Sequence, residues 1–404
     1  MQLTNGLGHL SYSTLVHPSD NWDELWSSLT TYVPRVKERV APNESFGVSL
    51  RLSAASVATL TRDGAARRQL RTFLDANDLY VYTVNAFPYG PFKGRVVKEL
   101  AYEPDWRSQE RTDYTIGVAE ILAEITDASI SPSIQTSPLA FKPRVECAAD
   151  VETMIENVLA VAAHLVRLRA RTGRLVRLAL EPEPYCYLET TDETLACFRS
   201  HLYSGSAAAR LSALCGIPLS EAHGALREHL GIVFDICHQA VVFDEIPASL
   251  QAIAEAGIPI FKLQAAAALY VPEVTHELIG ALDQFVNAVY LTQTFERTNG
   301  RVSRFLNLDA AVSDWERDPR PCEWRVHFHV PVFIEDLGAF KSTRFAIEEA
   351  LASHKRTRVS DHLEIETYTW DVLPPRVKAG DIVEYISREL EWVRDTLAAG
   401  SATD

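Results

Sequence analysis

Short strand-like apolar runs alternate with amphipathic helical stretches along most of this sequence. The strand-like runs are rich in Val, Ile, Phe and Tyr and end in polar residues. They cover residues 9–16, 46–52, 79–86, 129–135, 175–181, 231–235, 258–264, 324–332 and 362–370. A repeated strand–helix unit favours a parallel sheet, and eight such units close into a barrel. The sequence therefore predicts an α/β fold, a (β/α)8 TIM barrel.

Three helical stretches show the clearest periodicity. Apolar residues recur at i, i+3, i+4 and i+7 over residues 22–40, 151–166 and 382–397. Pro34 lies inside the first stretch, and a proline there is expected to kink or divide the helix.

Nine strand candidates are one more than a barrel holds, so one late strand is predicted to lie outside it. Residues 289–297 and 301–306 flank Thr298-Asn299-Gly300, which predicts a β-hairpin with an Asn-Gly turn. This hairpin belongs to a predicted insertion over residues 270–322, and a helical insertion is predicted over residues 191–229. We therefore expect one barrel domain over residues 1–397, followed by a flexible tail over residues 398–404.

Composition excludes several protein classes. The 404 residues are 47% hydrophobic, which is too apolar for a disordered chain. The net charge of −15 argues against nucleic-acid binding, because an acidic surface repels a phosphate backbone. No window reaches about 20 uninterrupted apolar residues, so no membrane span is expected. The six cysteines form no C-x-x-C pair, and the first residues lack the pattern of a secretory signal, so we expect a reduced, cytoplasmic location.

Polar residues at the ends of the predicted strands mark a candidate site. Barrel enzymes place catalytic groups at the carboxyl ends of the strands. The candidates at these ends are Glu181, Asp235, His238, Lys262, Gln264, His327, His329, Glu364 and Glu366. Carboxylates and imidazoles from several strands can hold one divalent ion such as Mn²⁺, Mg²⁺, Co²⁺ or Zn²⁺. Such an ion polarises a substrate carbonyl or hydroxyl and stabilises an enediolate, while neighbouring carboxylates move protons.

Structural roles are open for the same residues. Glu181 could form a salt bridge, and Asp235 could cap the helix that follows it. His327 and His329 share one face of a strand, where they could be ligands or core histidines. Which of Gln264, His327 and His329 binds metal stays open, and Lys262 could bind a phosphate or carboxylate of the substrate.

The loop after the third predicted strand is a candidate binding surface. It reads Phe87-Pro88-Tyr89-Gly90-Pro91-Phe92, and its prolines and glycine fix its shape, which favours binding over a slack connection. Tyr89, Phe92 and Trp106 could wall a pocket, and ordinary packing in the core is the alternative for the same residues. The sequence lacks the P-loop, the dinucleotide-binding glycine pattern, the two-histidine zinc-protease helix and the nucleophile elbow.

Three of the strand-end motifs resemble those of the xylose isomerase-like TIM barrels, the sugar phosphate isomerase/epimerase superfamily. They are Leu180-Glu181-Pro182, Asp235-Ile236-Cys237-His238 and Glu366-Thr367-Tyr368. The resemblance implies that Glu181, Asp235 and Glu366 bind metal, that Glu366 also acts as an acid or base, and that His238 contacts the substrate. By chain order Gln264 takes the place of the family's histidine ligand, and His329 could supply that imidazole from the inserted region.

Most of the chain also resembles the EboE proteins, the metabolite traffic proteins of bacterial ebo operons. The matching segments are His9-Leu10-Ser11-Tyr12 with His17-Pro18, and residues 85–92, 104–107 and 325–331. The resemblance implies a barrel with a metal site, encoded beside a prenyltransferase-like membrane protein and a sugar-phosphate-cyclase-like enzyme. Other ebo-operon proteins are then candidate partners, in the processing or export of a secondary-metabolite precursor.

The sequence thus predicts a metal-dependent isomerase or epimerase acting on a sugar- or cyclitol-like polyol, with or without a phosphate. Glu181, Asp235, His329 and Glu366 would hold the metal. Glu181 and Glu366 would move protons, and His238 would fix a substrate hydroxyl. The alternatives are a non-catalytic metabolite-binding or trafficking protein and a metal-dependent hydrolase or endonuclease-like enzyme.

Overall fold

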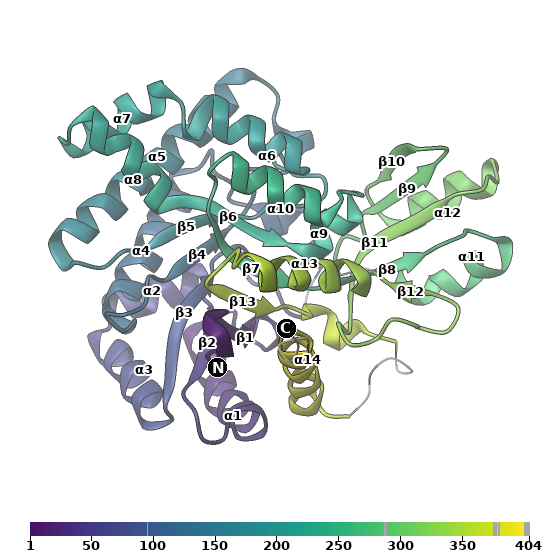
Figure 1. Cartoon of the computed structure of the whole chain (residues 1–404), viewed down its shortest axis with the longest axis horizontal. Helices are drawn as coiled ribbons and strands as arrows, with labels where there is room; N and C mark the ends of the chain where they lie inside the picture. Colours follow the sequence, from purple (N-terminus) through teal and green to yellow (C-terminus); the bar gives the residue numbers. More distant parts are fainter. Residues whose placement is uncertain (95, 287–288, 375–377, 379, 400–404) are drawn as a thin grey trace.

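A closed eight-stranded parallel barrel forms the centre of the computed structural model (Figure 1). The structure describes residues 1–404 except 95, 287–288, 375–377, 379 and 400–404, so most of the predicted tail lies outside the described residues. The barrel strands are β1 (His9–Tyr12), β2 (Phe46–Arg51), β3 (Leu79–Asn85), β4 (Ser133–Thr136), β5 (Arg177–Leu180), β6 (Leu230–Asp235), β7 (Ile260–Ala265) and β13 (His362–Ile365). They pair in the order β1-β13-β7-β6-β5-β4-β3-β2, and a parallel bridge between Ser13 and Ser49 joins the two ends. The barrel prediction is confirmed.

Helices pack around the outside of the barrel. They are α1 (Trp22–Val40), α2 (Ala54–Arg62), α3 (Gly64–Ala76), α4 (Gln109–Ile125), α5 (Ala148–Thr172), α9 (Ile236–Val241), α10 (Ile246–Glu255), α13 (Arg344–Arg356) and α14 (Ile382–Ala398). The predicted helical insertion between β5 and β6 holds α6 (Thr191–Cys197), α7 (Gly205–Cys215) and α8 (Leu219–His229).

Helix α1 continues unbroken through Pro34, so this proline does not divide the helix, and the alternative, a kink at Pro34, stays a prediction. Leu29, Val33 and Val36 are all buried on one face of α1, on both sides of the proline. Their packing outweighs the loss of one backbone hydrogen bond.

A second, antiparallel sheet projects from one side of the barrel (Figure 1). Its strands pair in the order β10-β9-β11-β8-β12, and they are β8 (Ala267–Val271), β9 (Thr294–Thr298), β10 (Arg301–Phe305), β11 (Glu323–Val330) and β12 (Lys341–Ser342). Helices α11 (His276–Leu282) and α12 (Leu308–Arg317) accompany it. The predicted late strand outside the barrel is β11. Strand pairing does not show whether the barrel and this sheet form one domain. A single domain over residues 1–397 therefore stays a prediction.

The predicted Asn-Gly hairpin is confirmed as β9 and β10. Thr298 pairs with Arg301, and the two residues between them have positive φ angles, 49° at Asn299 and 76° at Gly300. Two positive φ angles define the turn that suits the twist of a two-residue hairpin, and Asn-Gly adopts them at low cost.

Some predicted strands are shorter in the structure. The run over residues 9–16 ends as a strand at Tyr12, and the run over residues 362–370 ends at Ile365, followed by the 3-10 turn η7 (Tyr368–Val372). Both trimmed ends are where the chain leaves the barrel toward the candidate site. Strand β8 is an addition, because it follows β7 after a single residue, Ala266, and no turn signal separates the two strands.

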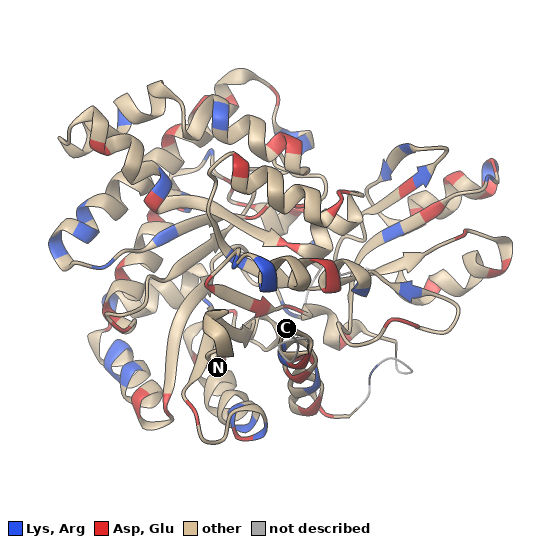
Figure 2. Cartoon of the chain, viewed as in Figure 1, with Lys and Arg blue, Asp and Glu red and all other residues tan. Residues whose placement is uncertain are grey.

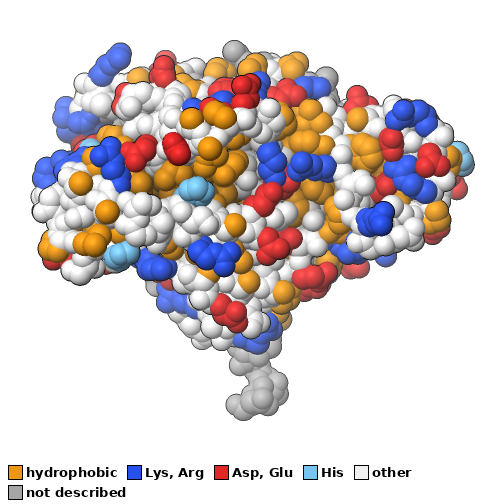
Figure 3. Space-filling view, turned by 90° about the horizontal axis from the view of Figure 1, so that it is seen from above, with side chains coloured by type: hydrophobic (Ala, Val, Ile, Leu, Met, Phe, Trp, Pro, Cys, Tyr) orange, Lys and Arg blue, Asp and Glu red, His pale blue; other side chains and the backbone are white. Residues whose placement is uncertain are grey.

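Basic and acidic residues are interspersed along the outer helices (Figure 2), and charged side chains of both signs are interspersed on the face seen in Figure 3. Within the part of the chain that the structure describes, no helix is long and apolar enough to cross a bilayer.

Candidate metal centre

Three buried carboxylates meet where the barrel strands end. Glu181 follows β5, Asp235 ends β6 and Glu366 follows β13. One oxygen from each lies within 4.8 Å of the other two. The strand order β13-β7-β6-β5 explains this grouping, because the carboxyl ends of neighbouring parallel strands open at the same end of the barrel.

Gln264 on β7 lies in the middle of these carboxylates. Its Nε2 donates to Asp235 Oδ2 at 2.6 Å, to Glu366 Oε2 at 2.8 Å and to Glu181 Oε1 at 3.2 Å. An amide nitrogen has only two hydrogens for these three acceptors. Gln264 Oε1 is buried and has no hydrogen-bond partner among the described residues. One neutral amide therefore donates to three acids, while its own oxygen accepts no hydrogen bond from the described residues.

The pKa values of the three acids follow from this crowding. Burial raises the pKa of Glu181 well above its usual range, and the nearby charges of Glu366 and Asp235 raise it further. Burial, together with the charge of Glu364, raises the pKa of Glu366 to about 8. Burial also raises the pKa of Asp235. A divalent cation among them would reverse all three shifts, because it favours the ionised form of each acid. The donor set fits such a cation.

His329 on β11 brings the inserted sheet to the centre. Its Nδ1 donates to the backbone oxygen of Glu366 at 2.7 Å, and its buried Nε2 has no hydrogen-bond partner in the described part of the chain. Burial lowers the pKa of His329 to about 4, so the ring is neutral. A neutral imidazole with one nitrogen anchored and the other free is the form that binds metals. Asp235, His238 and His329 form a ligand group within 4.8 Å.

A second ligand group lies beside the first. One ligand atom each from Glu183, His238 and His327 lies within 4.8 Å of the others. Nδ1 of His238 lies 3.0 Å from the oxygen of Pro182, and Nδ1 of His327 lies 3.0 Å from Gln293 Oε1. Burial lowers the pKa of His238 to about 3 and raises that of Glu183 to about 8. The cluster of buried His, Glu and Asp side chains could therefore hold more than one ion.

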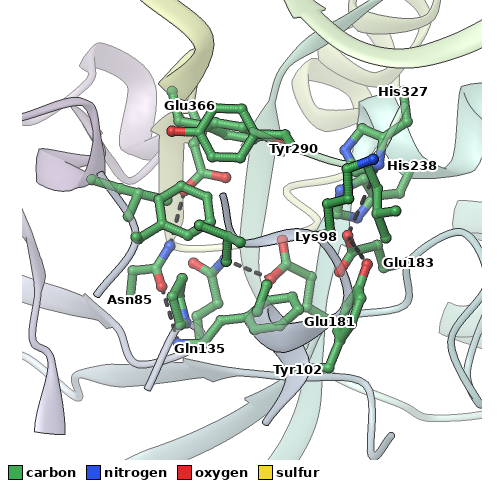
Figure 4. Close-up of a pocket in the computed structure, with 18 of the residues that line it drawn as sticks. Asn85, Lys98, Tyr102, Gln135, Glu181, Glu183, His238, Tyr290, His327 and Glu366 are labelled. Carbon is green, nitrogen blue, oxygen red and sulfur yellow. Dashed lines mark hydrogen bonds and ion pairs between the residues drawn. The ribbon is translucent and has the colours of Figure 1, made fainter. Parts of the chain in front are cut away.

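A cavity opens above these residues (Figure 4). Its lining combines the polar centre with apolar walls and consists of Leu15, Asn85, Phe87, Pro88, Phe92, Val97, Lys98, Ala101, Tyr102, Gln135, Glu181, Glu183, His238, Tyr290, Leu291, Gln293, His327, Glu366 and Tyr368. The three residues predicted to be catalytic, Glu181, Glu366 and His238, all line it. Asp235, Gln264 and His329 are not among its described lining residues. Gln264 contacts the carboxylates of Glu181 and Glu366, Asp235 contacts Gln264, and His329 contacts the backbone oxygen of Glu366.

The predicted substrate-binding residues fall in different places. Phe92 lines the cavity. Tyr89 packs against Tyr114, and Trp106 is fully buried in the main core; neither is among the described lining residues. Lys262 is also buried, and its Nζ lies 2.9 Å from Glu364 Oε1 inside the barrel. Tyr89, Trp106 and Lys262 are not among the described residues that line the cavity. Their predicted roles in substrate binding stay predictions.

Asn85 and Gln135 are site residues that the sequence analysis did not single out. Asn85 Nδ2 donates to Glu366 Oε1 at 2.9 Å, and Gln135 Nε2 donates to Glu181 Oε2 at 2.6 Å. Both residues lie at the ends of barrel strands, β3 and β4. The strand-end rule that found Glu181 and Gln264 could have found them too, if it had been applied to the polar residues that end the third and fourth predicted strands.

No protein-family model matches this chain. No curated protein matches it as a relative. The chain therefore has no such support for its resemblance to the EboE proteins, which stays a prediction.

Several solved structures are similar to the chain at low sequence identity. A D-tagatose 3-epimerase-like protein is 13% identical, with a TM-score of 0.49, covering 96% of this chain and 97% of its own. The IolI protein with a bound zinc atom is 12% identical, with a TM-score of 0.48 and coverage of 98% and 100%. A xylose isomerase-like TIM barrel protein from Mycobacterium smegmatis in complex with magnesium is 11% identical, with a TM-score of 0.47 and coverage of 96% and 99%. Likenesses this distant say nothing about what this chain binds or does.

Proposed function

We propose that this protein is a metal-dependent isomerase or epimerase acting on a polyol- or sugar-like substrate. One observation carries the proposal. Glu181 and Glu366 both line the cavity, and Gln264 joins them to each other and to Asp235 at a site that fits a divalent cation. Glu181, Asp235, Glu366 and His329 would hold that ion, with Gln264 and His238 beside it.

The two glutamates would share the proton transfers. Asn85 orients Glu366, and Gln135 orients Glu181, each through one hydrogen bond from a side-chain amide. One carboxylate would take a proton from the carbon next to a substrate carbonyl, which leaves an enediolate, and the other would return a proton to that carbon. Isomerisation would return the proton to the former carbonyl carbon instead, and a proton would then also pass from the substrate hydroxyl to the former carbonyl oxygen. His238 would bind a substrate hydroxyl from the cavity wall. The bound ion, when present, supplies polarisation of the substrate oxygen.

The resemblance to the EboE proteins supports a finer proposal. In that setting the substrate would be a precursor of a secondary metabolite, and other ebo-operon proteins would be partners in its processing or export.

A metal-dependent hydrolase is the second candidate. It is favoured by the additional ligand group of Glu183, His238 and His327, because hydrolases often place two ions side by side around one substrate. A non-catalytic carrier is the third candidate, and it would need no metal.

Metal analysis combined with deuterium exchange separates the three candidates. Purified protein is loaded with Mn²⁺, Co²⁺, Zn²⁺ or Mg²⁺, its metal content is measured, and pentoses, hexoses and keto-inositols, which all carry a carbonyl, are incubated with it in D₂O. Exchange of a substrate carbon-bound proton, lost in Glu366→Gln but kept in the exposed variant Glu120→Gln, is the expected result. Full metal content and exchange in Glu366→Gln would overturn the assignment. A chain without metal supports the carrier, and two ions without exchange support the hydrolase.

A further inference from the structure

The cavity has apolar walls that the proposed proton transfers do not use. Two small apolar clusters, both separate from the main core, form them. The Phe92 cluster contains Leu15, Phe92, Val97 and Tyr290. The Phe87 cluster contains Phe87, Tyr102, Phe141, Cys186 and Leu291. Most of these side chains are also cavity-lining residues, so a bound molecule would lie against them.

The aromatic side of the Phe92 cluster is a preformed surface. The ring centroids of Phe92 and Tyr290 are 5.0 Å apart, those of Phe92 and Tyr368 are 5.5 Å apart, and those of Tyr290 and Tyr368 are 5.2 Å apart. Rings at these distances and tilted to one another support each other's positions. Tyr290, Tyr368 and Glu366 all line the same cavity, so this surface and the carboxylates face one space (Figure 4).

Backbone contacts hold the loop that carries Phe92. The backbone nitrogen of Phe92 donates to Asp20 Oδ1 at 2.8 Å. The buried guanidinium of Arg51 donates to the backbone oxygens of Pro88 and Gly90 in the same loop. The wall therefore needs little ordering when a ligand binds, which favours affinity.

The lining offers few groups that bind a phosphate. Three glutamates, Glu181, Glu183 and Glu366, face the cavity, and Lys98 is the one Lys or Arg among its described lining residues. Lys93 is directed elsewhere, with its Nζ 2.7 Å from the backbone oxygen of Tyr368 and 3.3 Å from Asp371 Oδ2. A phosphate site would instead combine several Arg, Lys or backbone N–H donors.

We propose that the substrate joins an uncharged head, with neighbouring hydroxyl or carbonyl oxygens, to an apolar or aromatic body that lies against the Phe92 and Phe87 clusters, and that it carries no phosphate. The head would bind at the metal centre, so this part rests on the proposed function. The body binds by removal of apolar surface from water. The substrate is thus a derivatised polyol rather than a free sugar phosphate.

Two hydroxamates with the same metal-binding head test the apolar body. Acetohydroxamate and benzohydroxamate are titrated into the Mn²⁺-loaded chain by calorimetry. We expect benzohydroxamate to bind at least about tenfold more tightly, because only its ring reaches the apolar wall. Phe92→Ala should reduce the difference to about threefold or less and leave acetohydroxamate unchanged, whereas Phe345→Ala, at a partly exposed phenylalanine outside the lining, should change neither. Equal affinities in the wild type, or displacement of benzohydroxamate by millimolar inorganic phosphate, would overturn the inference.

A metal-independent measurement separates this inference from the proposed function. Crystals soaked in 4-bromobenzyl alcohol should show anomalous bromine density against the Phe92 cluster, with or without metal. Bromine in the cavity of a chain that binds no hydroxamate would leave the apolar body standing and overturn only the metal-dependent function. A cavity without bromine would overturn the apolar body.

Discussion

Nδ1 of His329 lies 2.7 Å from the backbone carbonyl oxygen of Glu366. A carbonyl only accepts hydrogen bonds, so Nδ1 carries the ring proton and Nε2 presents its lone pair. The backbone oxygen of His329 in turn accepts from Thr369 Oγ1 at 2.6 Å. Strand β11 of the inserted sheet is therefore tied to the segment that follows β13 at two points, and the inserted sheet brings His329 to the candidate metal centre.

Replacing His329 should weaken metal binding. His329→Gln removes the free imidazole nitrogen, and we expect the affinity for Mn²⁺ or Zn²⁺ to fall about ten- to hundredfold. Isothermal titration calorimetry measures this change. His223→Gln, at an exposed histidine on α8, is the matched control and should keep the wild-type affinity. An unchanged affinity in His329→Gln would remove this histidine from the ligand set.

Breaking the ion pair inside the barrel should cost much of the stability. Lys262 and Glu364 are both fully buried and lie 2.9 Å apart. Lys262→Met leaves a buried carboxylate without its cation, so we expect the free energy of unfolding to fall by about 3–5 kcal/mol. Urea unfolding measures the loss, and the double variant Lys262→Met/Glu364→Leu should recover most of it.

An exposed pair provides the comparison for that measurement. Arg35 and Asp381 lie 3.0 Å apart with about half of each side chain exposed. Arg35→Met should change the free energy of unfolding by less than about 1 kcal/mol. Equal losses in the buried and the exposed pair would contradict the role given to burial.

Acid should destabilise the fold through His17. Burial lowers its pKa to about 3 from the ordinary value of 6.5. The His17 imidazole is therefore protonated below about pH 6.5 in the unfolded chain, but only below about pH 3 in the folded chain. Stability is fully present above pH 6.5 and falls with decreasing pH, by up to about 1.4 kcal/mol per pH unit for this residue.

The variant His17→Gln isolates that contribution. It keeps a polar group near Tyr12, whose hydroxyl lies 3.2 Å from His17 Nε2, but does not titrate. Urea unfolding curves between pH 4.5 and 7.5 should show a shallower decline for His17→Gln than for the wild type or His223→Gln. Parallel curves for all three proteins would contradict this account.

The strand-end rule found part of the centre because it needs only the residues that directly follow an apolar run in the sequence. Glu181, Asp235 and Glu366 each follow an apolar run, and the barrel brings such ends together whatever the details of packing. The three contacts of Gln264 could not be predicted in this way. They depend on the directions of side chains from three other strands, which only the closed barrel sets.

Other features could not be predicted because they depend on contacts between residues that are far apart in the sequence. Strand β8 continues an alanine-rich apolar run, and it becomes a separate strand by pairing with β12 and with β11, where Trp324 lies opposite Val271. Trp106 illustrates the converse limit, because aromatic bulk after a strand suits a pocket wall and a core equally well. The structure places it in the core. Phe92, in the same connection, reaches the cavity.

A close approach between β6 and β7 should make Gly231 intolerant of a side chain. A Cβ atom there would lie 2.4 Å from the backbone oxygen of Pro259 and 2.7 Å from the ring of Phe261. Gly231→Ala must therefore shift backbone atoms, and we expect it to lower the free energy of unfolding by about 1–3 kcal/mol.

Gly224 on α8 is the matched control, because no described atom lies within 4 Å of its added Cβ. Gly224→Ala should stabilise the chain by about 0.5–1 kcal/mol, since alanine is the better helix former. Asp235 ends the strand that holds Gly231, so the same displacement should also weaken metal binding. A Gly231→Ala variant with wild-type stability and metal affinity would show that this strand contact does not position the centre.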